Sequence, residues 1–346
     1  MSDDALMEEP VQFGEASRLF GILTVPNAPP GKAPELPVFV FLSAGLLHRV
    51  GPYRLHVRLA RELAGMGFPS LRVDLAGMGD SPPRAGLTTQ QSVAEDFAEI
   101  MGLVDARLGR RPIVLAGLCI GADNATNLTL KEPRVVGMVL LDPICFPDRG
   151  YRARAILAKY TNPARYIGWL RRHLRTLAAS RRLPSKQDRS IDPLALRYAS
   201  TPEQLAATFE AVRVREGQVL SVFTSYALHY YNQAGQLGRA LGIKDYSQFC
   251  SELFWPWARH TYATETHRRR LIEEIKNWAS AYVRREEPAA GRHSPVITLL
   301  RRSGFQAALP KLRVHLPRFR TIEARVSTWF NNGRKAIHDA DRSDGT

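Results

Sequence analysis

The sequence predicts an α/β protein with a mostly parallel central sheet that helices flank on both sides. Short apolar runs alternate with amphipathic stretches through the first half of the chain, which is typical of parallel strands joined by helices. A glycine-framed cysteine, Cys119, stands where one of these strands passes into a helix. The alternation stops over residues 146–214 and then resumes, so we expect a helical cap inserted into the sheet domain.

Each expected element has a local signal. The continuous apolar run 37–42 is typical of a strand buried on both faces. Leu55, Leu59 and Leu63 repeat at four-residue spacing, which places them on one helical face, and Gly67 follows as a cap. On the same grounds we expect strands at residues 19–25, 37–42, 71–75, 112–118, 135–141, 218–223 and 248–256. We expect helices at residues 53–66, 92–108, 122–130, 233–241 and 264–283.

The length and composition indicate one main domain with insertions. A chain of 346 residues with 45% hydrophobic content can form one large core. We assign residues 1–145 and 215–283 to this core and residues 146–214 to the cap. From residue 284 the sequence turns to Pro, Gly and Arg with scattered apolar residues. That composition predicts a basic, partly disordered C-terminal extension over 284–346.

The N-terminus and the cysteines bear on location and cofactors. Met1 to Pro10 is acidic where a signal peptide is basic and then apolar, and no window approaches a membrane span, so we expect a cytoplasmic protein without a transmembrane segment. Three scattered cysteines argue against a disulfide framework and form no CxxC pair for zinc. We therefore expect neither a metal nor a cofactor.

The formal charge of +15 is unevenly distributed. Between Arg149 and Arg189 a dozen Lys and Arg residues face a single acid, Asp188. One interpretation is a solvated helical face in an Arg-rich protein. The other is a docking surface for an acyl carrier protein, a CoA phosphate tail or an anionic membrane face. Nucleic acid is disfavoured as a partner, because no helix-turn-helix, zinc-finger or RNA-recognition signature accompanies the charge.

The stretch Gly117-Leu118-Cys119-Ile120-Gly121 predicts a nucleophile elbow with sulfur in place of the usual serine oxygen. Glycines flank such a nucleophile because it lies on a strained turn, where larger side chains would collide with the neighbouring strand and helix. A thiolate at this position is stabilised by the positive end of the helix dipole. The backbone N–H of Ile120 is then the expected donor to an oxyanion.

Four stretches carry a family resemblance: residues 43–52, 58–61, 72–81 and 117–123. They resemble bacterial α/β-hydrolases related to the exosortase-associated hydrolases, and the resemblance covers roughly residues 15 to 283. It implies an α/β-hydrolase fold with a helical cap. It also implies that Leu46, in the loop after the third strand of that fold, supplies the second oxyanion N–H.

His260 is the expected general base. In this fold the chain order is nucleophile, acid, histidine. His260 follows the last expected strand and precedes the closing helix, whereas His267 falls within that helix and the later histidines lie in the extension.

The acid of the triad is ambiguous. Residues 224–229 follow the strand 218–223 without a carboxylate, where the acid usually stands. Asp142, directly after the strand 135–141, is the best substitute, but it also fits a turn before Pro143. Asn232 is an alternative that would orient the imidazole through an amide, and a Cys-His pair without a third member is a further possibility.

Three functions follow from these residues. The first is cleavage of an ester or thioester through a Cys119 acyl-enzyme. The second is transfer or cyclisation of an acyl group, moved from a carrier-protein or CoA thioester to an amine or alcohol, because a cysteine acyl-enzyme is itself a thioester. The third is a non-catalytic, degenerate hydrolase that acts as a binding protein, which an incomplete triad would favour.

Overall fold

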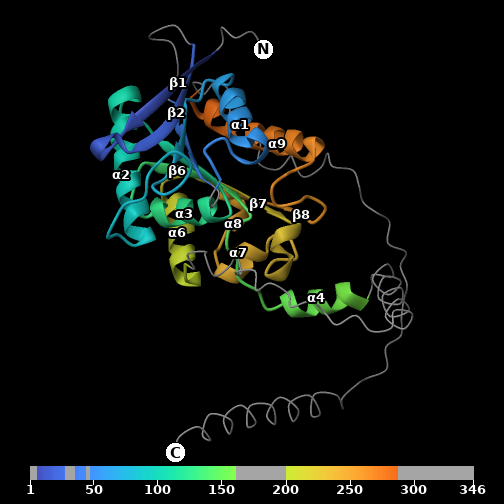
Figure 1. Ribbon diagram of the computed structural model, residues 1–346. Helices are drawn as coiled ribbons and strands as arrows, with labels where there is room; N and C mark the ends of the chain where they lie inside the picture. The colour runs from blue at the N-terminus through green and yellow to red at the C-terminus, as the bar shows by residue number, and fades with distance from the viewer. Residues whose placement is uncertain (1–5, 28–35, 44–46, 161–199, 287–346) are drawn as a thin grey trace, which may run out of the picture. The chain divides into compact units, whose positions relative to one another are not determined.

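An eight-stranded sheet runs through the protein in the order β1-β2-β4-β3-β5-β6-β7-β8 (Figure 1). The computed structural model describes residues 6–27, 36–43, 47–160 and 200–286. The first two pairings, β1 with β2 and β2 with β4, are antiparallel, and all later pairings are parallel. The strands are β1 (Leu6–Phe13), β2 (Leu19–Pro26), β3 (Val38–Leu42), β4 (Ser70–Asp74), β5 (Ile113–Leu118), β6 (Val135–Leu141), β7 (Gln218–Thr224) and β8 (Cys250–Trp255).

Helices cover both faces of this sheet. The principal ones are α1 (Leu55–Ala64), α2 (Thr89–Leu108), α3 (Ile120–Thr129), α4 (Tyr151–Tyr160), α6 (Pro202–Val214), α7 (Gln236–Leu241), α8 (Tyr246–Phe249) and α9 (Glu265–Glu286). Short 3-10 turns lie at Glu15–Ser17, Pro52–Arg54 and Ser225–His229. α1 and α9 pack on one face, whereas α2, α3 and α6 pack on the other.

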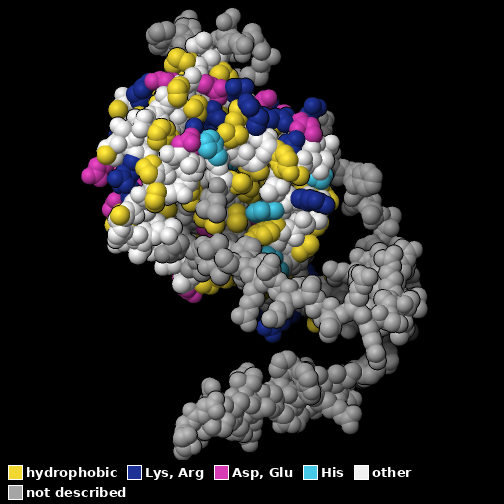
Figure 2. All heavy atoms as spheres, in the orientation of Figure 1, with side chains coloured by type: hydrophobic (Ala, Val, Ile, Leu, Met, Phe, Trp, Pro, Cys, Tyr) yellow, Lys and Arg dark blue, Asp and Glu magenta, His cyan; other side chains and the backbone are white. Residues whose placement is uncertain are grey.

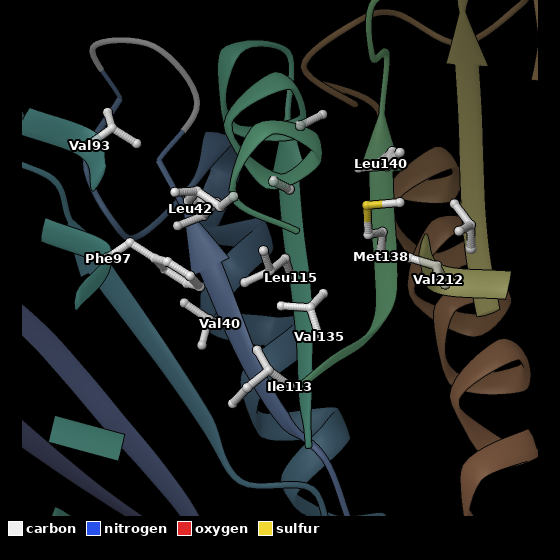
Figure 3. Close-up of a cluster of buried hydrophobic side chains, with 14 of the residues drawn as sticks. Val40, Leu42, Val93, Phe97, Ile113, Leu115, Val135, Met138, Leu140 and Val212 are labelled. Carbon is white, nitrogen blue, oxygen red and sulfur yellow. The ribbon is translucent and has the colours of Figure 1, made fainter. Parts of the chain in front are cut away.

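The alternation of side chains along each strand explains this layering. In β3, Val40 and Leu42 belong to the cluster that contains α2 and α3 (Figure 3). Phe39 and Phe41 point to the opposite face, where they meet α1 and α9. Since both faces of the parallel strands are covered, β3, β4 and β5 are buried along their whole length. The α/β-hydrolase fold expected from the sequence is confirmed.

Strand β1 was not expected from the sequence. Its acidic residues Glu8 and Glu9 and the following Pro10 do not form an apolar run, and Val11 is its only buried residue. β1 lies at the edge of the sheet, where a polar strand with a proline is tolerated because one side of its backbone needs no partner.

The expected cap and extension are only partly described. Within the range 146–214, α4 and α6 are described, whereas residues 161–199 are not. α6 contributes Leu205, Phe209 and Val212 to the main core cluster, so this helix packs as part of the sheet domain. α9 continues to Glu286, and the rest of the expected extension lies outside the described residues. None of the described helices is both long enough and apolar enough to cross a membrane, and the expected cytoplasmic location stays a prediction.

The parallel strands bring distant residues to one edge of the sheet. Cys119 directly follows β5, Asp142 follows β6, Thr224 ends β7, and His260 lies shortly after β8. The carboxyl ends of parallel strands are the usual place for binding and catalysis in open α/β sheets. This edge therefore holds the candidate site.

Candidate active site

Cys119 occupies a strained turn between β5 and α3. Its backbone has φ 56 and ψ −118, which is unusual for a residue other than glycine. The turn is tied down on both sides, because Cys119 N donates to Leu141 O at 2.8 Å and Asp123 N donates to Cys119 O at 3.0 Å. The side chain is partly exposed. The thiol is thus presented at the edge of the sheet at the start of a helix.

The two glycines of the motif leave no room for side chains. A Cβ at Gly117 would collide with the backbone of Gly121 and Ala122. A Cβ at Gly121 would lie 2.7 Å from Ser43 O and clash there. The close approach of strand β5, helix α3 and the loop after β3 therefore requires glycine at both positions.

We expect Gly117→Ala to destabilise the protein by about 1–3 kcal/mol or more, because the added methyl meets backbone atoms that cannot move independently. Chemical denaturation measures the change. Gly102→Ala is the matched control, because Gly102 lies inside α2 with open space where a Cβ would stand, and there we expect a gain of about 0.5–1 kcal/mol. Equal stability of the Gly117→Ala protein and the wild type would contradict the close approach.

His260 is joined to Asp142 by a short hydrogen bond. His260 Nδ1 lies 2.6 Å from Asp142 Oδ2. The other ring nitrogen is free of this bond, and the Cys119 side chain lies near enough to His260 to raise its pKa. The structure therefore brings together the three residues that the sequence pointed to: a thiol, an imidazole and a carboxylate.

Thr224 holds the carboxylate in place. Asp142 is fully buried, and its Oδ1 accepts from Thr224 N at 2.6 Å while its Oδ2 accepts from Thr224 Oγ1 at 2.7 Å. Thr224 occupies the end of β7, where the sequence has no carboxylate. The end of β7 thus supplies hydrogen-bond donors to a carboxylate that comes from the end of β6. The turn-residue alternative for Asp142 does not account for these contacts.

The surroundings of His260 favour its protonated form. Burial by itself lowers the pKa of His260, but the hydrogen bonds to Asp142 and Cys119, together with their negative charges, raise this pKa to about 9. The imidazolium form of His260 is therefore stable near neutral pH.

This pKa predicts how stability depends on pH. Folding raises the pKa of His260 from 6.5 to about 9, so the folded protein holds this proton more tightly than the unfolded chain. The resulting stabilisation is fully present below pH 6.5 and is lost as the pH rises to about 9. We expect the wild type to exceed His260→Gln in thermal midpoint at low pH and the difference to shrink over that interval. His267→Gln is the control, and a difference that grows above pH 6.5 would contradict the prediction.

Tyr226 is a neighbour of the histidine that the sequence did not reveal. Its ring stacks on His260 with centroids 4.1 Å apart and an interplanar angle of 26°, and His229 meets Tyr226 edge-on. Tyr226 N donates to Thr224 Oγ1, so the stacking ring comes from the segment that also holds Asp142. The stacked ring restricts rotation of the imidazole. No sequence signal marks this residue, because its role depends on the approach of the loop after β8.

The structure describes one of the two expected oxyanion donors, Ile120. Ile120 is the first residue of α3, where a backbone N–H has no partner within the helix. This N–H comes directly after Cys119, as an oxyanion donor requires. Leu46 lies outside the described residues.

His48 and Arg49, close to Leu46 in the chain, belong to a polar cluster with Asp74 and Asp80. Ligand atoms of His48, Asp74 and Asp80 lie within 4.8 Å of one another, as a metal site would require. The guanidinium of Arg49 lies among them, however, and its Nη1 contacts both carboxylates and the His48 ring. Arg49 N also donates to Asp74 Oδ1 at 2.5 Å. The cluster is thus occupied by a cation of the chain itself and anchors the loop after β3.

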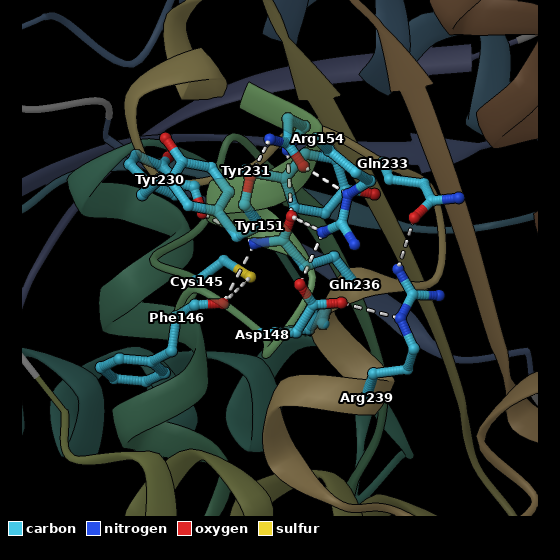
Figure 4. Close-up of polar contacts among 12 residues, drawn as sticks. Cys145, Phe146, Asp148, Tyr151, Arg154, Tyr230, Tyr231, Gln233, Gln236 and Arg239 are labelled. Carbon is cyan, nitrogen blue, oxygen red and sulfur yellow. Dashed lines mark hydrogen bonds and ion pairs between the residues drawn. The ribbon is translucent and has the colours of Figure 1, made fainter. Parts of the chain in front are cut away.

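Asn232 does not contact His260 through any hydrogen bond among the described residues. Its Oδ1 accepts from Arg154 Nε at 2.8 Å, and its Nδ2 donates to Tyr151 O at 3.0 Å. Figure 4 shows the network around it, in which Asp148 also contacts Arg154 and Arg239. These bonds fasten α4 to the sheet domain. Arg154, one of the basic residues considered for docking a partner, is therefore engaged within the chain.

The remaining cysteines are buried. Cys145 and Cys250 belong to the main core cluster, and burial raises the pKa of both thiols, with Glu252 adding to the effect. Both are therefore poor nucleophiles. Cys119 is the one cysteine that is not buried, and it lies at the carboxyl end of β5.

Comparisons with known proteins agree with this fold. The model of the family described as serine aminopeptidase, S33 matches residues 39–213. Human protein ABHD12B is 34% identical over 91 residues, which is 26% of this chain and 24% of the relative. Lysophosphatidylserine lipase ABHD12 of Xenopus tropicalis is 30% identical over 95 residues, 28% of this chain and 23% of the relative. The chain thus matches about a quarter of the length of these curated relatives.

A solved esterase structure from Pyrococcus furiosus has the same fold. It aligns with a TM-score of 0.51 at 10% sequence identity, over 81% of this chain and 92% of the esterase. At that identity the likeness concerns the fold alone. The family match spans half of the chain and includes β5, the cysteine turn and β6. The chain therefore belongs to the serine aminopeptidase S33 family of α/β-hydrolases.

Proposed function

We propose that the protein is a hydrolase that cleaves an ester or thioester through an acyl intermediate on Cys119. The observation that carries this proposal is the cluster of Cys119, His260 and Asp142, in which His260 Nδ1 is hydrogen-bonded to Asp142 and the Cys119 side chain is near enough to His260 to raise its pKa. It supplies a nucleophile, a base and an orienting acid in the order that acyl transfer needs.

In the first half-reaction the Cys119 thiolate attacks the acyl carbonyl carbon. The carbonyl oxygen becomes an oxyanion, to which Ile120 N–H donates, and we assign the second donor to Leu46 N–H. As the intermediate collapses, the bond to the leaving group breaks and the His260 imidazolium gives its proton to the departing alcohol or thiol. Asp142 holds the ring so that its second nitrogen faces the reaction.

In the second half-reaction water releases the acid. Neutral His260 takes a proton from water, and the resulting hydroxide attacks the acyl–sulfur carbonyl carbon. The carbon–sulfur bond then breaks, and the free acid leaves while the Cys119 thiolate and the His260 imidazolium are restored. Atoms and charges balance with water as the co-reactant.

The experiment that tests this proposal also distinguishes it from the other two functions considered from the sequence. Acyl transfer shares the first half-reaction and differs in the acceptor, an amine or alcohol in place of water. The non-catalytic alternative depended on a missing acid, and the hydrogen bond between Asp142 and His260 weakens that argument. The name of the Xenopus relative, a lipase, supports ester cleavage within the family. A closer kinship with the exosortase-associated hydrolases stays part of the proposal.

Intact-mass spectrometry with a panel of short-chain and long-chain acyl thioesters and p-nitrophenyl esters tests the proposal. We expect a transient acyl adduct that maps to Cys119 and decays to free acid. If amines or alcohols are added, formation of a product that contains the acceptor would identify the reaction as acyl transfer and not as hydrolysis. Cys145→Ala should keep the adduct and Cys119→Ala should lose it. A protein that acquires no adduct and turns over no substrate would be the non-catalytic alternative.

A further inference from the structure

The ring of Tyr226 covers one face of the His260 imidazole. The two ring centroids lie 4.1 Å apart, and the ring planes are inclined by 26°. The His260 side chain is 25% exposed. Over β7 and β8, Figure 2 shows histidine side chains beside hydrophobic ones. The contact between the two rings is therefore partly shielded from water.

The hydrogen bond and the stacked ring restrain different motions of the imidazole. His260 Nδ1 lies 2.6 Å from Asp142 Oδ2, and this bond fixes one atom of the ring. One hydrogen bond leaves the ring free to tilt about the line that joins these two atoms. A second ring stacked on the face opposes the tilt, because tilting separates the planes on one side and makes them collide on the other. The direction of His260 Nε2 is thus set by Asp142 and Tyr226 together.

The segment that carries the Tyr226 ring is held at both ends. Tyr226 N donates to Thr224 Oγ1 at 3.3 Å, and Thr224 donates in turn to both carboxylate oxygens of Asp142. At the other end of the 3-10 turn, Leu228 O accepts from Tyr151 Oη at 3.1 Å. The stacked ring and the carboxylate therefore share one support, the end of β7.

The stacked ring also acts on the charge of the imidazole. The face of an aromatic ring attracts a cation that lies within about 6 Å of its centroid. The His260 imidazolium lies well inside this limit, whereas a neutral imidazole gains less from the same contact. Asp142 and Cys119 face the imidazole from the ends of β6 and β5, and His229 meets the Tyr226 ring edge-on. The Tyr226 ring favours the protonated imidazole in the same direction as Asp142 and Cys119, but without a charge of its own.

We propose that Tyr226 is a positioning residue for His260, whose ring fixes the plane of the imidazole and stabilises its protonated form. The consequence for turnover rests on the proposed hydrolase function. In that reaction His260 gives a proton to the leaving group in the first half-reaction and takes one from water in the second. Both transfers require His260 Nε2 to point at the reacting atoms. An imidazole held in one plane meets this requirement in both halves.

An NMR titration of the whole protein, isotope-labelled at histidine Cε1, tests the effect on charge without any turnover. The His260 signal is identified as the one that is absent from His260→Gln. In Tyr226→Leu we expect the pKa of His260 to fall by about 0.5 to 1, because the cation loses its contact with the ring face. Tyr226→Phe keeps the ring and should have the pKa of the wild type. An unchanged pKa in Tyr226→Leu would overturn the proposal.

Tyr151→Phe is the matched control. It removes the hydrogen bond to Leu228 O and loosens the segment, but it leaves the Tyr226 ring in place. We expect the pKa of His260 to stay unchanged in this variant. An equal fall in Tyr151→Phe and Tyr226→Leu would assign the effect to loosening of the segment and would also overturn the proposal.

The variants of Tyr226 should fold, because this residue is only partly buried and belongs to neither core cluster. If Tyr226→Leu nevertheless fails to fold, Tyr226→Gln provides the same comparison, since glutamine also lacks an aromatic ring.

Steady-state kinetics with the best ester or thioester of the panel tests the positioning. Tyr226→Leu should lower kcat by about 10- to 100-fold and leave KM nearly unchanged, because the ring acts on the base and not on the substrate. Tyr226→Phe should restore most of kcat. A raised KM with unchanged kcat would make Tyr226 a substrate contact and contradict the positioning role. If the wild type turns over no substrate while the pKa of His260 still falls in Tyr226→Leu, the proposed function fails and the effect of the ring on the imidazole stands.

Discussion

Replacing Cys119 by alanine is expected to lower kcat by about 10⁴-fold or more, to the rate left by binding and the oxyanion donors alone. The sulfur is the atom that forms the acyl bond in the proposed mechanism, and neither buried cysteine can replace it. Steady-state hydrolysis of the best ester or thioester from the panel measures the effect. The fold should be retained, because the side chain is partly exposed and its backbone contacts do not involve sulfur.

Two further variants separate chemistry from structure. Cys145→Ala should keep the activity at a cost in stability of about 1 kcal/mol, because it removes a buried atom from the core. Cys119→Ser should fall between wild type and Cys119→Ala, since the turn is the one that usually carries a serine, whereas a hydroxyl needs a stronger base than a thiol does. Full activity in Cys119→Ala would remove this residue from the mechanism.

The sequence singled out Cys119 and His260 as candidate site residues because neither signal depends on a contact between distant segments. The glycines around Cys119 report a close approach of backbone segments that any such turn must make, and the structure has that approach at Gly117 and Gly121. His260 was found from its position after the last strand, which depends only on the order of the elements. Both residues can be recognised in the sequence without knowledge of any side-chain contact.

Other parts of the site depend on contacts between distant segments. Asp142 was ambiguous because an Asp before proline suits an ordinary turn, and only the pairing of β6 with β7 brings Thr224 against its carboxylate. Tyr226 stacks on His260 across two loops. The ion pairs of Glu8 with Arg61 and Arg72 join β1 to α1 and β4, and the strand that carries Glu8 had no strand signal of its own.

Replacing Asp142 by asparagine is expected to reduce kcat/KM by about 10³- to 10⁴-fold. An amide of nearly the same shape can still accept from Thr224 N, so the buried position stays filled. Its NH₂ group cannot accept a hydrogen bond from His260 Nδ1, so the imidazole loses both its orienting partner and the charge that stabilises its protonated form. We expect the pKa of His260 to fall, which shifts the alkaline limb of the kcat/KM profile to lower pH.

Thr224→Val is the matched control for this substitution. It removes the Oγ1 donor to Asp142 Oδ2 but keeps the charge of the carboxylate and the Thr224 backbone N–H contact. A loss of about tenfold would fit a carboxylate that is less firmly positioned but still ionised. If Asp142→Asn instead leaves both the rate and the pH profile unchanged, the enzyme works with Cys119 and His260 alone. In that case the carboxylate serves to hold the ends of β6 and β7 together, because its contacts with Thr224 would be its whole function.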